Sequence, residues 1–223
     1  MTGPIVVKCG GAVAESSAEL ILELASAEPV VVVHGAGPQI SAQMQRRGLD
    51  VEFVGGRRVT SKEALEVVRE SLVEVNATLC EAIGELALPL FGDEIGIHAQ
   101  QVPTLGLVGD PLPCAPAAVA AALDEGLIPV VAPLAAGPLN VNADEMAAAL
   151  AVGLDADRIL FVTDVPGLLD GGVVVPVIDA EAAGKLLDAG AFEGGIIPKL
   201  RAAITAAQLG VRAEIGRTQV IAA

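Results

Sequence analysis

Short runs of apolar, mostly β-branched residues alternate along the chain with longer segments of helical periodicity. The clearest runs lie at 5–7, 30–33, 128–131 and 159–162, with weaker ones at 173–177 and 211–215. Runs that are apolar at successive positions are typical of strands buried on both faces of a parallel sheet. The segments between them predict helices at 16–27, 37–47, 61–86, 116–125, 143–153, 179–189 and 198–209. We therefore predict an α/β fold, a three-layer α/β/α sandwich with a mainly parallel central sheet.

The segment 61–86 carries the most regular pattern. Apolar residues recur there every three or four positions and form one stripe along a helix: Leu65, Val68, Leu72, Val75, Leu79 and Ile83. Ser61 is a suitable N-cap for this helix. Such a stripe can pack on the sheet or on a second chain, and we predict a homodimer. The Pro/Gly-rich stretch 133–138 is the best candidate for a boundary between two lobes, 1–138 and 139–223.

Composition narrows the class of protein. The 223 residues include 13 basic and 28 acidic side chains, a net charge of −15, and 53% hydrophobic residues, which excludes intrinsic disorder. A shortage of Lys and Arg, together with the absence of Trp and Tyr, argues against a nucleic-acid partner. No apolar run is long enough to span a membrane and no leader pattern precedes the first strand, so we expect a cytoplasmic protein. Cys9, Cys80 and Cys114 lack CxxC spacing, and we expect them to be reduced and buried.

Glycines and charged residues follow the predicted strands, where ligands of open α/β sheets bind. The first strand leads into Lys8-Cys-Gly-Gly11 and the second into His34-Gly-Ala-Gly-Pro38. Backbone N–H groups in such glycine-rich turns suit an anion. The phosphate-loop pattern GxxxxGK[ST] is absent, and His34 taken alone is expected to be a structural histidine.

Four more segments add charge at strand ends or helix starts: Gly55-Gly-Arg-Arg-Val-Thr60, Asn140-Val-Asn-Ala-Asp144, Thr163-Asp-Val-Pro-Gly-Leu168 and Gly194-Gly-Ile-Ile-Pro-Lys199. Each has an ordinary structural explanation, such as solvated arginines, a helix-capping acid, a turn or a surface lysine. Together they give two lysines, two glycine-rich turns, an arginine and an aspartate. Phosphoryl transfer needs this inventory, because cations and N–H donors stabilise the transferring group.

In this order the motifs resemble the amino acid kinase family, in particular its members that phosphorylate N-acetylglutamate in arginine biosynthesis. The matching segments are Lys8-x-Gly-Gly11, His34-Gly-x-Gly-Pro38, Gly56-x-Arg-Val-Thr60, Leu107-Val-Gly109, Asn140-Val-Asn-Ala-Asp144, Thr163-Asp-Val-Pro-Gly167 and Gly195-Ile-Ile-Pro-Lys199. They extend over nearly the whole chain. The resemblance implies an enzyme that transfers the γ-phosphoryl group of ATP to the γ-carboxylate of N-acetyl-L-glutamate.

The resemblance also implies roles for individual residues. Lys8 and Lys199 would stabilise the transferring phosphoryl group, and Asp144 would orient both lysines. Amides at Gly11, Ala36 and Gly37 would bind the phosphoryl oxygens and the acyl substrate. Arg58 would hold the α-carboxylate of that substrate, and Asn140 would contact the same molecule. The residues that would hold ATP are Asp164, Val165, Pro166, Gly167, Leu168, Leu169, Ala191, Phe192 and Glu193. Mg²⁺ would bridge the ATP phosphates with few protein ligands, so no separate metal site is expected.

Ala36 departs from the family pattern, because it replaces the middle glycine of His-Gly-Gly-Gly. The substitution is tolerable only if the φ angle of Ala36 is negative. The connection 133–139 is also shorter than the hairpin that usually precedes Asn-Val-Asn-Ala-Asp.

Two other functions stay open at this point. The nearest alternative enzyme is a kinase of lysine biosynthesis that acts on aminoadipate bound to a small acidic carrier protein, but a net charge of −15 disfavours docking of an acidic carrier. A non-catalytic nucleotide or amino-acid sensor is the second alternative, and the presence of Lys8, Asp144 and Lys199 argues against it.

Overall fold

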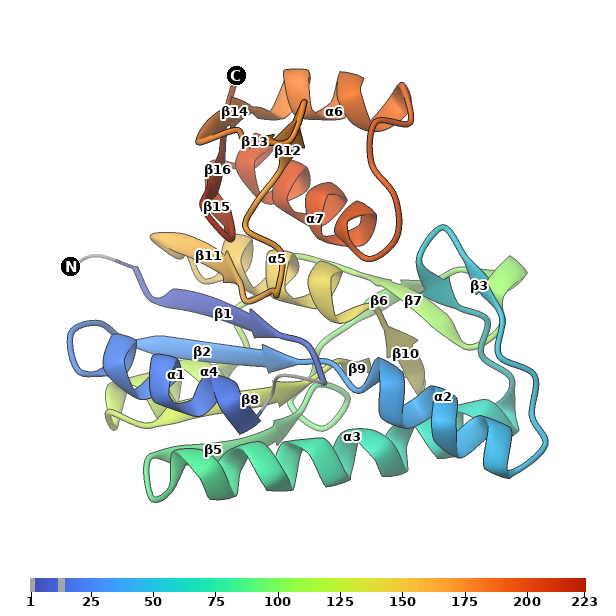
Figure 1. Cartoon of the computed structure of the whole chain (residues 1–223). Coiled ribbons are helices and arrows are strands. Elements are labelled where there is room, and N and C mark those ends of the chain that lie inside the picture. Colours follow the sequence, from blue (N-terminus) through green and yellow to red (C-terminus); the bar gives the residue numbers. More distant parts are fainter. Residues whose placement is uncertain (1–2, 12–14) are drawn as a thin grey trace.

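An eight-stranded, mainly parallel sheet forms the centre of the protein (Figure 1). The computed structural model describes residues 3–11 and 15–223. The strand order is β14-β16-β15-β11-β1-β2-β8-β5, in which the six strands from β15 to β5 are parallel, β16 is antiparallel to β15, and β14 is parallel to β16. Their bounds are β1 Ile5–Cys9, β2 Val30–His34, β5 Ala87–Phe91, β8 Ile128–Ala132, β11 Arg158–Phe161, β14 Val177–Asp179, β15 Arg212–Ile215 and β16 Thr218–Ile221.

Helices cover both faces of this sheet, which confirms the three-layer α/β/α prediction. They are α1 Ala18–Ala25, α2 Gly37–Arg46, α3 Lys62–Ile83, α4 Ala117–Asp124, α5 Ala143–Gly153, α6 Ala180–Asp188 and α7 Ile196–Gln208. Short 3₁₀ turns lie at Glu15–Ser17 and Pro103–Leu105. The helices α1 and α3 pack on one face, and α4, α5 and α7 pack on the other.

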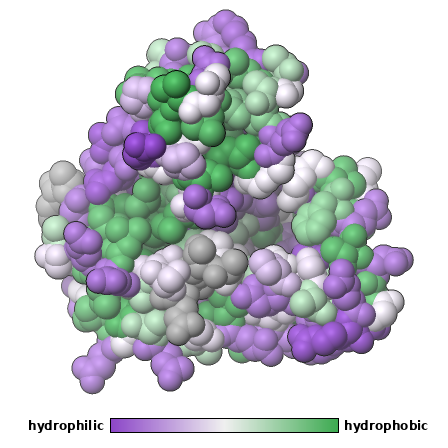
Figure 2. All heavy atoms as spheres, in the orientation of Figure 1, coloured by the Kyte–Doolittle hydropathy of each residue, from purple (hydrophilic) through white to green (hydrophobic). Residues whose placement is uncertain are grey.

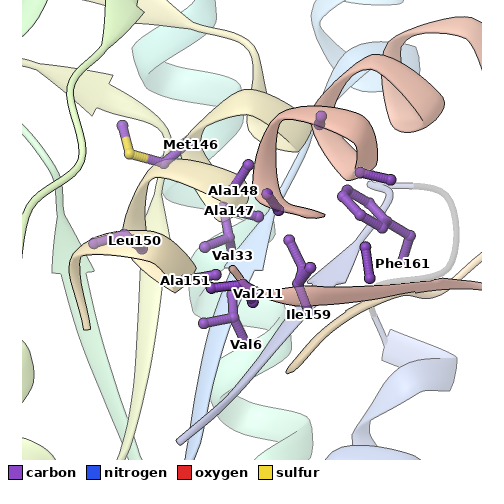
Figure 3. Packing of buried hydrophobic residues seen from close by; sticks show 14 of the residues in the cluster. Val6, Val33, Met146, Ala147, Ala148, Leu150, Ala151, Ile159, Phe161 and Val211 are labelled. Carbon is purple, nitrogen blue, oxygen red and sulfur yellow. The ribbon is translucent and has the colours of Figure 1, made fainter. Parts of the chain in front are cut away.

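The apolar runs supply both layers of the core, because successive strand residues point to opposite faces. Ile5 and Val7 of β1 belong to the cluster beneath α1 and α3, whereas Val6 belongs to the cluster beneath α5 and α7. Figure 3 shows the second cluster, which contains Ile159 and Phe161 of β11 together with Ala147, Ala148 and Ala151 of α5. Small residues on α5 let this helix approach the sheet closely, and its N-terminus is thereby fixed beside the carboxyl end of β1.

Smaller strand pairs complete the fold. A four-stranded sheet has the order β6-β7-β10-β9, and two hairpins pair β3 with β4 and β12 with β13. Their bounds are β3 Phe53–Val54, β4 Arg57–Arg58, β6 Ala99–Gln101, β7 Val108–Pro111, β9 Leu134–Ala135, β10 Leu139–Val141, β12 Leu169–Asp170 and β13 Val173–Val174. The turn between β3 and β4 consists of Gly55 and Gly56, whose φ angles of 59° and 85° are those that a two-residue hairpin turn requires.

Three features differ from the sequence prediction. The helix α3 ends at Ile83 rather than at Leu86, because Gly84 adopts a φ of 85° and terminates it. The run 173–177 is not one strand: it divides between β13 and β14. The apolar stripe of α3 is buried against its own chain, with Leu79 fully inaccessible, so this stripe does not supply a surface for a second copy.

The stretch 133–138 contains the first strand and the turn of a hairpin, in which residues 133–135 are buried and Gly137 and Pro138 are exposed. Leu134 and Ala135 form β9, which pairs antiparallel with β10 in the interior. One sheet also runs without interruption through strands from both predicted lobes, since β1 pairs with β2 on one side and with β11 on the other. The division into lobes 1–138 and 139–223 stays a prediction.

The surface is mixed, with hydrophobic residues gathered on the upper part of the molecule around β12, β13 and β14 (Figure 2). Leu169, Val173 and Val177 are the exposed apolar residues of these strands. No helix in the described part of the chain is long and apolar enough to cross a membrane. All three cysteines are free thiols; Cys9 is buried, whereas Cys80 and Cys114 are half-buried.

Candidate active site

Two cavities meet at Lys199 and Gly195, at the edge where the parallel strands end. We call the first the sheet-edge cavity; it has a volume of about 470 Å³ and lies between the ends of β1 and β2, the β3–β4 hairpin and the start of α5. The second, the loop cavity, has a volume of about 500 Å³ and is lined by residues 163–169 and the segment before α7. In Figure 1 the strands β1 and β2 point toward this region.

Lys8 and Asp144 form a buried ion pair in the sheet-edge cavity. The distance from Lys8 Nζ to Asp144 Oδ1 is 2.8 Å, and each side chain is no more than 7% exposed. Lys8 extends from β1, and Asp144 stands in the first turn of α5, where the Asn142 side chain accepts hydrogen bonds from the N–H groups of Asp144 and Glu145. The cap fixes the helix start, and the helix start fixes the carboxylate beside the lysine.

Lys199 lines both cavities from the first turns of α7. Its ammonium donates to the carbonyl of Gly195 at 3.2 Å and forms no ion pair with any residue of 3–11 or 15–223. Burial lowers the pKa of Lys199, with the nearby charge of Lys8 acting in the same direction and Asp144 opposing it. The predicted link from Asp144 to both lysines is thus a close ion pair to Lys8 and a longer-range attraction to Lys199.

The glycine-rich turns supply backbone N–H groups, and Gly11 leaves no room for a side chain, whereas Gly37 has open space around it. A Cβ atom on Gly11 would lie 2.7 Å from the carbonyl oxygen of Gly35 and 2.8 Å from the Cα of Ala36, so the turn tolerates only glycine. Ala36 has a φ of −140°, which meets the condition that its methyl group imposes. Gly37 begins α2, whose N-terminus faces the cavity.

Arg58 is a buried cation without a protein anion. Its guanidinium donates to Ser41 Oγ at 2.8 Å and to the carbonyl of Gly37 at 3.1 Å, and it lies 4.6 Å from the ring centre of Phe53. Only 6% of the residue is exposed, and burial lowers its pKa. No carboxylate among the described residues pairs with it. A buried unpaired charge is costly, so this position favours an anionic ligand.

Asn140 completes the wall of the sheet-edge cavity. Its amide group donates to Thr60 Oγ1 at 3.0 Å, and Thr60 in turn donates to the carbonyl of Arg58. The contact joins β10 to the segment that carries Arg58. Asp144 is the single carboxylate among the residues that line this cavity, and Lys8 already neutralises it.

The predicted nucleotide residues all line the loop cavity, together with Thr163, Gly195, Ile196 and Lys199. The loop is tied to the sheet by Leu168, whose N–H donates to Thr218 Oγ1 at 2.8 Å. A Cβ atom on Gly167 would approach the same hydroxyl to 2.6 Å, which explains the glycine. Phe192 and Leu169 give the cavity apolar walls, and Lys199 gives it one cation at the junction with the sheet-edge cavity.

His34 is buried beside a side-chain amide, in keeping with the structural histidine expected from the sequence. Its Nε2 lies 3.0 Å from Nδ2 of Asn76, and the same Asn76 amide donates to the carbonyl of Val130. The imidazole is fully buried, and burial lowers its pKa to about 4. It is therefore neutral at pH 7 and adds no charge to the site.

Within the described part of the chain, no group of three or more His, Cys, Asp or Glu side chains could hold a metal ion. The sheet-edge cavity brings together the cations of Lys8, Arg58 and Lys199, the carboxylate of Asp144 and the N–H donors of the glycine-rich turns. Such an arrangement can bind an anion at Arg58 and stabilise negative charge between Lys8 and Lys199.

Arg57, Glu145 and Asn142 are structural partners of the site that sequence reasoning did not assign. Arg57 pairs with Asp110 and Glu145, and Asn142 donates to the carbonyl of Gly56 at 3.4 Å. The doubled arginine in the sequence is the only signal for the contacts of Arg57, and it does not indicate which of the two arginines pairs with acidic side chains.

Comparison with known proteins agrees with this geometry. The family model described as "Amino acid kinase family" matches residues 3–216. An acetylglutamate kinase of Pelotomaculum thermopropionicum is 36% identical, covering 82% of this chain and 70% of its own length. An acetylglutamate kinase of Cereibacter sphaeroides is 37% identical, and the match covers 96% of this chain and 80% of that protein. The crystal structure of smu.665 from Streptococcus mutans UA159 has a TM-score of 0.91 and 29% identity, with full coverage of both chains. A family match over residues 3–216, together with relatives 36–37% identical over most of their length, shows that the chain belongs to the amino acid kinase family.

Proposed function

We propose that this protein is an acetylglutamate kinase: it transfers the γ-phosphoryl group of ATP to the γ-carboxylate of N-acetyl-L-glutamate. The product is N-acetyl-L-glutamyl 5-phosphate, an intermediate of arginine biosynthesis. The relatives named acetylglutamate kinase, at 34–37% identity over most of this chain, support the assignment.

The observation that carries the proposal is the pair of unpaired cations in the sheet-edge cavity, buried Arg58 and half-buried Lys199. Two cations at separate points of one cavity favour a dicarboxylate. Arg58 would hold the α-carboxylate, and the γ-carboxylate would lie at the lysines. A free α-ammonium would find no unpaired carboxylate in the lining described, since Asp144 is engaged by Lys8. Acetylation removes that ammonium, so the lining supports N-acetylglutamate over free glutamate.

In the proposed reaction a γ-carboxylate oxygen attacks the γ-phosphorus of ATP. The bond from that phosphorus to the β–γ bridging oxygen breaks, and ADP departs with the electron pair. The carboxylate is already ionised, so no proton has to be removed and no general base is needed. Lys8 and Lys199 stabilise the charge on the phosphoryl oxygens, and Asp144 holds Lys8 in place. The amides of Gly11 and Gly37 add neutral donors.

Mg·ATP is the second substrate in this proposal and would occupy the loop cavity. The apolar side chains of Leu169 and Phe192 suit the base, and Lys199 suits the phosphates at the junction of the cavities. Mg²⁺ would bridge the phosphates and stay largely hydrated, which agrees with its usual binding to few protein carboxylates.

Trapping the acyl phosphate with hydroxylamine tests the proposal. The purified protein is incubated with Mg·ATP and, in parallel, with N-acetylglutamate, glutamate, N-acetylaminoadipate or aspartate. We expect hydroxamate with N-acetylglutamate alone. Hydroxamate with another of these substrates would contradict the specificity. Tight ATP binding without hydroxamate in any tube would overturn the assignment and favour a carrier-bound substrate or a sensor.

Replacing Lys8 separates a kinase from a sensor. Lys8→Met removes one cation from the transferring group, and we expect kcat to fall by a factor on the order of 10²–10³. Binding of a non-hydrolysable ATP analogue, followed by calorimetry, should persist. Lys185→Met is the matched control, because Lys185 is an exposed lysine that pairs with Glu181 on α6. Turnover by Lys8→Met close to that of Lys185→Met would contradict the proposed role.

Three broader features are also proposed. The protein would act in the cytoplasm, where its three free thiols stay reduced. Its acyl-substrate lobe would comprise 1–138 and its nucleotide lobe 139–223. It would form a homodimer, and light scattering would then give twice the 22.4 kDa of one chain.

A further inference from the structure

Arg57 joins three elements around the sheet-edge cavity. Its Nε donates to Glu145 Oε1 at 2.9 Å, and its Nη2 lies 2.6 Å from Asp110 Oδ1. Glu145 belongs to the first turn of α5, and Asp110 belongs to β7. The guanidinium on β4 therefore bridges two carboxylates that come from two separate elements. An arginine can do this because its planar fork carries donors in several directions.

The same hairpin carries Arg58, and the same helical turn carries Asp144. Neighbouring strand residues point to opposite faces, so Arg58 reaches Gly37 and Ser41 of α2 while Arg57 reaches Glu145 of α5. Both arginines line the sheet-edge cavity. Glu145 directly follows Asp144, which pairs with Lys8. Arg58, which would hold the substrate carboxylate, and Asp144, which pairs with Lys8, are therefore linked through the ion pair between their neighbours Arg57 and Glu145.

Further contacts bring the turn of the hairpin to α7. A Cβ atom on Gly56 would lie 3.4 Å from Pro198, the neighbour of Lys199, and one on Gly55 would lie 3.6 Å from Arg201 Nη1. The hairpin has only two residues in each strand and pairs with no other strand of the described residues, so its own hydrogen bonds hold it weakly. The position of the hairpin therefore depends on its contacts with α7 and on the ion pairs that Arg57 forms with Asp110 and Glu145.

The surroundings of Glu145 strengthen this dependence. Its side chain is 23% exposed, and its second oxygen, Oε2, is buried without a hydrogen-bond partner in the described residues. Burial raises the pKa of Glu145, and the Arg57 contact opposes that shift. Without Arg57, the carboxylate of Glu145 would have lost its cationic partner and would lie beside the negative charge of Asp144.

We propose that Arg57 is a positioning residue for the kinase reaction. Its pairs with Glu145 and Asp110 fix the β3–β4 hairpin against α5, and this holds Arg58 in a fixed position relative to Asp144. The inference rests on the proposed function for the roles of these two residues. The position of the hairpin itself can be measured without turnover.

Kinetics give the first test. Arg57→Ala should raise the KM for N-acetylglutamate and lower kcat/KM by roughly tenfold or more, since small displacements at a reacting centre carry such losses. Arg57→Lys should recover part of the loss. The double variant Arg57→Ala/Glu145→Ala should lose little more than Arg57→Ala alone, because both changes break one contact. Arg212→Ala is the matched control, since Arg212, which belongs to β15, also lies near two carboxylates, those of Asp157 and Glu214.

Hydrogen exchange gives the second test. Backbone amides of residues 53–58 should exchange roughly tenfold faster or more in Arg57→Ala than in Arg212→Ala or the unaltered protein. If Arg57→Ala does not fold, Glu145→Gln provides the same comparison.

The outcomes separate the two proposals. Absence of hydroxamate in the unaltered protein would overturn the proposed function, while hairpin exchange would still report on Arg57. Unchanged exchange in Arg57→Ala, or losses that multiply in the double variant, would overturn the positioning role even in an active enzyme.

Discussion

Lowering the pH from 7 to 5 is expected to destabilise the protein through His34, at the end of β2. The amide orientation of Asn76 is fixed by the hydrogen bond from its Nδ2 to the carbonyl of Val130, so Nδ2 also faces His34 Nε2 as a donor. Neutral imidazole can accept there. Protonation would set two donors against each other in a buried place that also lies near the charge of Lys8.

The sign and size follow from the two pKa values of His34, about 4 in the folded protein and 6.5 as the ordinary value. Because the folded value is the lower one, the unfolded chain binds the proton more readily, and stability falls as the pH drops below 6.5. At pH 5 most unfolded chains carry this proton and few folded ones do. Linkage then gives a loss of about 2 kcal/mol relative to pH 7.

Urea unfolding of the unaltered protein and of His34→Gln at pH 7 and pH 5 measures this contribution. The variant loses packing at both pH values but has no imidazole to protonate, so the stability difference should shrink by about 2 kcal/mol at pH 5. His98→Gln, at an exposed histidine, is the control for the substitution itself. An equal stability difference at both pH values would refute the argument.

Three further changes test other parts of the structure. Because burial lowers the pKa of Lys199, kcat should decline on the alkaline side with an inflection below the ordinary lysine value of 10.5; a Lys199→Arg pH profile should lack that inflection, since guanidinium stays charged. Gly11→Ala forces a methyl group to within 2.8 Å of Ala36 and should lower kcat/KM about 10²-fold, whereas Gly184→Ala, with open space around it, should not. Ser61→Ala removes the cap on the N–H of Ala64 and should cost about 1 kcal/mol in chemical denaturation, with Ser61→Asp restoring it.

The buried strands could be predicted because both of their faces are apolar, so β1, β2, β8 and β11 have a pattern that no solvated segment shares. The strand β5 could not be predicted, since Ala-Leu-Pro-Leu-Phe has no β-branched residue and its proline is tolerated only at the sheet edge. The strands β6, β7, β9 and β10 have two to four residues each, too few for a period to show.

The candidate site was largely accessible from the sequence because parallel strands bring their carboxyl ends to one edge. Residues as distant as Gly11 and Asn140 thereby line one cavity. What the sequence cannot supply is the direction of each side chain. Arg57 and Arg58 are neighbours of identical chemistry, and only the register of a two-residue hairpin directs Arg58 to Ser41 of α2 and Arg57 to Glu145 of α5.

The order of strands at the β14 edge also has a consequence for how the protein matures during synthesis. The strand β14 enters the sheet only by pairing with β16, which itself pairs with β15. The loop that carries Leu168 is held by a hydroxyl 50 positions later, on Thr218. A ribosome therefore releases residues 163–179 well before their sheet partner exists. The central strands β1, β2 and β8 are all synthesised before this partner, so we expect a nascent chain to be able to pair them before its loop cavity can be completed.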